Sequence, residues 1–136
     1  MKNFIGYNLW GILWGLFILI LICIPGRYLP DVPQFIDLFK PDKLVHVIMF
    51  AVFVYFWTGG LSKQTSYDFP RLNPVFTALL IAVIFSGITE ILQRFFIPGR
   101  ICSVYDFIAN VVGCFAGYGA YSWRVKRKPR GDRVTG

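Results

Sequence analysis

Charged side chains are scarce in this sequence, and they leave too little polar surface for a water-soluble globule. Of the 136 residues, 15% are charged, whereas 56% are hydrophobic and 18% are aromatic. An average soluble domain carries about 25% charged residues. The composition therefore excludes an ordinary soluble protein and indicates an integral membrane protein with a single domain, residues 1–136.

Histidine and cysteine are also scarce, which excludes several kinds of site. His46 is the one histidine, so a histidine-rich metal site cannot form. The three cysteines have no CxxC spacing and support neither a disulfide framework nor a zinc site. No GxSxG or HExxH motif is present. We expect no cofactor and no bound metal, although His46, Glu90 and Asp106 leave a divalent-cation site as an alternative.

Four long apolar runs account for most of the chain. A helix needs roughly 17–25 apolar residues to cross a hydrocarbon core, and the runs lie at residues 7–24, 44–60, 75–92 and 104–123. The first run is too long for a signal peptide and lacks a small-x-small cleavage pattern, so we expect it to be retained. The sequence thus predicts an all-α integral membrane protein, folded as a four-transmembrane-helix bundle.

Basic residues are distributed unevenly around these predicted helices. The tail, residues 124–136, carries six basic residues and one acidic residue, and short basic segments stay in the cytoplasm. Both termini and the loop at 61–73 are then cytoplasmic, while the loops at 25–43 and 93–103 face outward. The tail is expected to anchor the topology and to contact anionic lipid, with no nucleic acid as partner.

Polar side chains of three predicted helices lie at one level, towards the outer face of the membrane. They are spaced by three or four residues along each helix, so they share a face. An unpaired ionisable group inside the bilayer costs about 2.5–3.5 kcal/mol, so such groups turn inward and pair. We expect an outward-opening, ligand-binding pocket, to which the Pro98-Gly99 turn returns Arg100. Its residues are Lys43, His46, Glu90, Gln93, Arg100, Asp106 and Asn110.

These residues also have structural interpretations. Lys43 can extend to the membrane interface from a helix start, and Asp106 can stabilise a helix N-terminus. Glu90 can form an ion pair with Arg100 or Lys43. The helix dipole disfavours a carboxylate near a helix C-terminus, so Glu90 is the hardest of them to explain by helix stability alone.

Two glycine pairs match the small-xxx-small spacing that lets membrane helices approach closely. They are Gly11 with Gly15 in the first predicted helix and Gly113 with Gly117 in the fourth. We expect these two helices to pack on each other through their glycines. A homodimer interface is the alternative.

The polar motifs together resemble the VanZ-like family of small bacterial membrane proteins. The resemblance rests on DKLVH at residues 42–46, EILQRFFIPGR at 90–100 and DFIANVVG at 106–113. It implies the same helical bundle, in the bacterial cytoplasmic (inner) membrane. The family's named member is associated with resistance to teicoplanin, a lipoglycopeptide that acts on cell-wall precursors, which suggests a role in the cell envelope.

Three functions are compatible with these residues. The first is binding of a membrane lipid, a lipid-linked molecule or a lipoglycopeptide headgroup, with an acyl chain against Phe50, Phe53, Phe95 and Phe96. The second is an enzyme on a lipid-linked substrate, with His46 as general base oriented by Glu90 or Asp106. The third is a structural subunit of a larger envelope complex, in which the polar cluster joins the helices.

Overall fold

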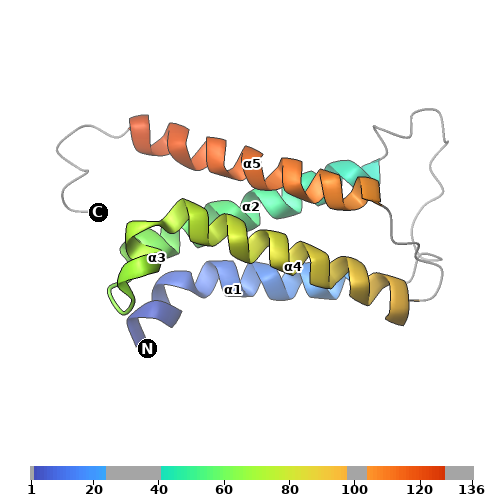
Figure 1. Ribbon diagram of the computed structural model, residues 1–136, viewed down its shortest axis with the longest axis horizontal. Helices are drawn as coiled ribbons and strands as arrows, with labels where there is room; N and C mark the ends of the chain where they lie inside the picture. Colours follow the sequence, from blue (N-terminus) through green and yellow to red (C-terminus); the bar gives the residue numbers. More distant parts are fainter. Residues whose placement is uncertain (1, 24–40, 98–103, 128–136) are drawn as a thin grey trace.

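The structure is a computed structural model that describes residues 2–23, 41–97 and 104–127, and within these ranges its regular secondary structure is entirely helical. The four long helices of the described residues lie side by side, and a short helix sits at one end of the bundle (Figure 1). The prediction of an all-α fold is confirmed for this part of the chain. The helices are α1 (Lys2–Ile22), α2 (Pro41–Lys63), α3 (Asp68–Leu72), α4 (Pro74–Phe96) and α5 (Val104–Arg127).

The long helices extend beyond the apolar runs from which they were predicted. α2 continues to Lys63, and α5 continues to Arg127. Long basic side chains reach water from a helix end, so the helix does not have to stop where hydropathy falls. α3 was not predicted at all, because it forms within the polar segment at 61–73 that was expected to be a loop.

Within the described residues, three helices are long and apolar enough to cross a membrane. They are α1 over Phe4–Ile22, α2 over Leu44–Lys63 and α4 over Pro74–Phe96. α5 is not among them, since Asp106, Asn110 and its basic last turn lower its apolar character. The structure thus gives three candidate spans, and a fourth span through α5 stays a prediction.

The distribution of side chains in α4 is the reverse of that in a soluble helix. Ile84, Ile88 and Ile91 point outward, with about half of each side chain exposed. A helix in lipid can present its largest apolar side chains outward and keep small and polar ones for helix contacts. This arrangement is that of a membrane protein. The buried residues of α4 are Ala78, Ala82, Ser86, Thr89, Glu90 and Gln93.

α2 is the central helix of the bundle, and it contacts each of the four others. Its Phe50 and Phe53 belong to a buried apolar cluster that also includes Ile18 of α1 and Ala82 of α4. The Phe53 ring stacks on that of Phe85, with centroids 5.0 Å apart. The apolar core is therefore built around one face of α2.

Both glycine pairs pack against α2, so the prediction that the first and last long helices meet through their glycines is wrong. A Cβ added at Gly113 would lie 2.9 Å from the Cα of Val47, and one at Gly117 would lie 2.9 Å from the carbonyl carbon of Ala51. A Cβ at Gly11 would instead meet the Trp57 ring at 2.9 Å. The glycine spacing identifies a face for close approach, but it does not identify the partner helix.

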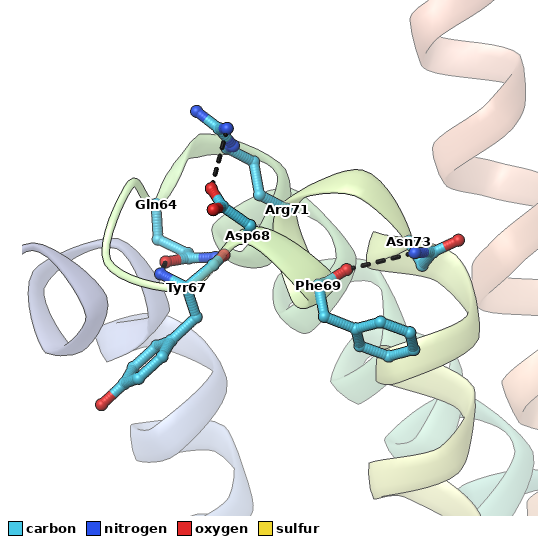
Figure 2. Close-up of polar contacts among 6 residues, drawn as sticks. All are labelled: Gln64, Tyr67, Asp68, Phe69, Arg71 and Asn73. Carbon is cyan, nitrogen blue, oxygen red and sulfur yellow. Dashed lines mark hydrogen bonds and ion pairs between the residues drawn. The ribbon is translucent and has the colours of Figure 1, made fainter.

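The segment between α2 and α4 is held by side chains acting on the backbone (Figure 2). Buried Gln64 donates from Nε2 to the Tyr67 carbonyl at 2.7 Å and accepts from the Tyr67 N–H at 2.9 Å. The ring of Tyr67 packs edge-on against Phe4 of α1. One side chain therefore closes the turn, and Tyr67 fixes that turn against the start of α1.

Alanine substitutions in α5 test the close approach to α2. Gly113→Ala and Gly117→Ala are expected to destabilise the fold by about 1–3 kcal/mol, because the added methyl group meets rigid backbone atoms of α2. Gly119→Ala is the matched control, since a Cβ there meets no atom within 4 Å. Thermal unfolding in detergent, followed by circular dichroism, measures the difference. Equal melting temperatures for all three variants would contradict the helix contact.

Candidate functional site

The predicted polar residues that the structure describes lie near one end of the bundle. At this end α2 and α5 begin, and α1 and α4 finish (Figure 1). We call it the His46 end. His46, Glu90 and Asn110 come from three different helices, and each is at most 4% exposed. The polar faces that the sequence predicted are therefore brought together in the interior of the bundle.

Asn110 is the centre of this cluster. Its Oδ1 lies 2.8 Å from Nδ1 of His46. Its Nδ2 donates to Oγ of Ser86 at 2.8 Å and to Oε1 of Glu90 at 3.3 Å. One amide therefore joins α2, α4 and α5 by hydrogen bonds. We name these four residues, His46, Ser86, Glu90 and Asn110, the Asn110 cluster.

The hydrogen bonds of Asn110 relate the tautomer of His46 to the ionisation of Glu90. An ionised carboxylate only accepts hydrogen bonds, so with Glu90 ionised the amide nitrogen of Asn110 faces Glu90, and its oxygen faces His46. That oxygen accepts, and Nδ1 of His46 is then the donor of the 2.8 Å bond.

The α4 side of the cluster follows from helix spacing. Ser86 and Glu90 are four residues apart, so their side chains stand one above the other on the face towards α5. Between them, Thr89 donates from its hydroxyl to the Ser86 carbonyl at 2.8 Å. This bond ties the Thr89 hydroxyl to the helix backbone, which leaves Ser86 and Glu90 as the α4 groups that bond Asn110.

The other predicted site residues lie one helical turn from the cluster or outside the described residues. Gln93 is buried at 4% exposure, one turn beyond Glu90 on the same face of α4. Asp106 is half-buried in the first turn of α5, one turn before Asn110. Arg100 lies outside the described residues, and so does the side chain of Lys43.

Two of the four phenylalanines expected to take an acyl chain have a different role. Phe50 and Phe53 are at most 2% exposed and belong to the apolar core around α2. They cannot form an open wall, because side chains of α1, α2 and α4 already cover them. Phe95 and Phe96, by contrast, are 72% and 73% exposed at the end of α4 and remain available to lipid.

The cation site of His46, Glu90 and Asp106 does not form within the described part of the chain. No three His, Cys, Asp or Glu side chains lie close enough there to hold a metal ion. The Asn110 cluster has one carboxylate, one imidazole, one amide and one hydroxyl. Such a set suits hydrogen bonds to sugar, amine or phosphate groups better than it suits a metal.

Ser86 is the part of the cluster that the sequence analysis did not place among the site residues. A serine in an apolar helix usually bonds to its own backbone, so the residue alone predicts little. The available signal was its spacing of four from Glu90. That spacing puts the hydroxyl on the same face as the carboxylate and within reach of the same partner.

The fold and the cluster define a small, all-helical membrane protein in which buried polar groups of three helices meet at one end of the bundle. A family model described as VanZ/LLP1 matches residues 7–125 of the chain. The chain therefore belongs to the VanZ/LLP1 family, and the resemblance predicted from its polar motifs is confirmed. No curated protein and no solved structure was found to match it.

Substitutions in the Asn110 cluster should rank by the number of hydrogen bonds lost. Asn110→Leu removes the hydrogen bonds to three side chains and is expected to cost about 1–3 kcal/mol or more, because polar groups stay buried. Ser86→Ala removes one of these bonds and should cost about 0.5–1.5 kcal/mol. Unfolding in detergent by heat or by denaturant gives both values. A larger cost for Ser86→Ala would contradict a network centred on Asn110.

Proposed function

We propose that this protein binds an amphiphilic ligand from the outer leaflet, in a polar pocket formed by the Asn110 cluster with Lys43, Gln93, Arg100 and Asp106. The ligand is a membrane lipid, a lipid-linked precursor or a lipoglycopeptide headgroup. The proposed role is in maintenance of the cell envelope, including response to glycopeptides such as teicoplanin. Arg100 and Lys43 would contact phosphate or carboxylate groups, and the acid and amide groups would contact sugar or amine groups.

The observation that carries this proposal is the convergence of ionisable and amide groups from α2, α4 and α5 on Asn110. A bundle of this size needs no carboxylate and imidazole in its interior for stability alone, because apolar residues of similar volume are often as stabilising. Intramembrane ionisable groups that face the bundle interior commonly mark ligand or ion sites. In the sequence, the DKxxH and PGR motifs add two cations, Lys43 three residues before His46 and Arg100 four residues after the end of α4.

The proposal includes the predicted topology. α5 would be the fourth span, since its outward side chains Ile108, Val112 and Phe115 are at least half exposed and apolar. The basic last turn of α5 would then lie in the cytoplasm, which places the His46 end at the outer face of the bacterial cytoplasmic membrane. A ligand would reach the cluster from that side.

Native mass spectrometry of the protein, released gently from the membrane, tests ligand binding. Wild type is expected to carry a discrete adduct of lipid mass. Glu90→Gln, which keeps the shape of the side chain, and Arg100→Ala should both lose it. Arg94→Ala is the matched control, because Arg94 is an exposed cation of the same segment whose guanidinium lies by the Phe95 ring.

Comparison is made between variants of equal thermal stability, so that loss of the adduct is not loss of fold. Retention of the adduct in Glu90→Gln and Arg100→Ala would overturn the proposed site. So would equal loss in Arg94→Ala, because the adduct would then depend only on surface charge.

The burial of the Asn110 cluster favours a second candidate function, a latch between helices in a structural subunit of a larger complex. His46 and Glu90 bond to opposite ends of one amide, so a latch predicts that their substitutions are coupled. In a double-mutant cycle of His46→Gln and Glu90→Gln, the expected coupling energy is about 0.5–3 kcal/mol. Additive effects, measured by unfolding in detergent, would remove the latch.

A further inference from the structure

A cleft of about 370 Å³ opens at the end of the bundle opposite to the Asn110 cluster. It lies between α1, α2 and α5, near the first turns of α1 and the last turns of α2 and α5. In Figure 1 this is the end at which α3 lies. The cleft shares no residue with the Asn110 cluster, so any ligand of the cleft is a separate one.

Glycines make the cleft hollow. A Cβ added at Gly6 meets no atom within 4 Å, and one at Gly59 meets only the Tyr121 ring, at 3.8 Å. Gly60 differs from both, because a Cβ there would press into the Tyr7 carbonyl and the Asn8 side chain of α1. Gly60 thus brings α1 and α2 together, while Gly6 and Gly59 leave space that no side chain fills.

Two cations stand at the rim of the cleft. Lys63 is the last residue of α2, and Arg124 is in the last turn of α5. Among the described residues that line the cleft, none is acidic. The positive charge of the rim is therefore not neutralised by the lining, and it favours an anionic group.

Arg124 is held in place by an aromatic neighbour. Its Nη1 donates to the Tyr55 hydroxyl at 2.5 Å, and its guanidinium carbon lies 5.7 Å from the centroid of that ring. The hydroxyl of Tyr121, also in the lining, pairs with Ser62 at 2.9 Å. A guanidinium has five N–H donors, and the Tyr55 hydroxyl accepts from one of them. This bond orients the planar group, and its other N–H donors can bind a phosphate.

The opposite part of the cleft is apolar, and exposed apolar side chains follow it along α1. Trp10 and Phe56 line it, with ring centroids 6.4 Å apart. Leu13 and Phe17 follow Trp10 at helical spacing and are 47% and 44% exposed. Cations at a helix end, beside a row of exposed apolar side chains that leads towards the middle of the bundle, match the two parts of a phospholipid.

We infer that this cleft binds an anionic glycerophospholipid, with its phosphate against Lys63 and Arg124 and an acyl chain along Trp10 and Phe56. The inference is independent of the proposed outer-leaflet ligand. The basic last turn of α5 puts this end of the molecule on the cytoplasmic side in the predicted topology, where anionic lipid is enriched.

Binding is measured on delipidated full-length protein in detergent by native mass spectrometry, with dioleoyl phosphatidylglycerol, dioleoyl phosphatidylcholine and glycerol 1-phosphate as probes. Phosphatidylglycerol is expected to bind the most tightly. The double variant Lys63→Gln, Arg124→Gln should weaken its binding about tenfold or more. The control Arg71→Gln, Arg127→Gln removes the same charge outside the cleft and should leave the affinity close to that of wild type.

A second variant blocks the cleft and keeps its charges. Gly6→Leu places a side chain into open space and should weaken phosphatidylglycerol binding without loss of stability. Gly87→Leu is its control, since a Cβ at Gly87 on α4 also meets no atom within 4 Å. Equal affinity for phosphatidylcholine, or equal loss in the charge control, would overturn the site. Binding of glycerol 1-phosphate as tight as that of the lipid would overturn the lipid as its ligand.

Discussion

The close approach of α5 to α2 is the contact on which the rest of the structure depends. Gly113 and Gly117 place the backbone of α5 against that of Val47 and Ala51. Val47 directly follows His46, and Gly113 lies one turn beyond Asn110. The alignment of α5 on α2 that brings the two backbones together is therefore also the one that forms the 2.8 Å hydrogen bond between His46 and Asn110. A bulkier residue at Gly113 would shift the hydrogen-bonded pair as well as the helix.

Periodicity in the sequence predicted most of the fold and part of the site. Helical spacing placed Glu90 and Gln93 on one face, and the structure buries both. Spacing could not predict that Asn110 would be the centre, because that depends on which atoms meet across helices. Nor could it predict that Phe50 and Phe53 fill the core, since an aromatic ring is equally compatible with a pocket wall. Spacing also could not predict which helix each glycine pair packs against, because that too depends on which residues meet across helices.

The two ends of the bundle use different chemistry. At the His46 end, polar groups are buried and form hydrogen bonds to one another across three helices. At the other end, Lys63 and Arg124 stand at the rim beside aromatic rings. Between the two ends lies the apolar core around Phe53 and Phe85. The buried polar cluster and the charged, open surface therefore lie at opposite ends of one small bundle, with the apolar core between them.

The order in which the ribosome makes these helices has a consequence for the Asn110 cluster. His46 on α2 is synthesised first, Ser86 and Glu90 on α4 follow, and Asn110 comes last, on α5. His46 and Glu90, whose burial in lipid costs free energy, are therefore made before the Asn110 amide that joins them by hydrogen bonds. During that interval the nascent bundle needs water, lipid headgroups or the insertion machinery beside its polar face. The polar face is covered only when α5 is complete.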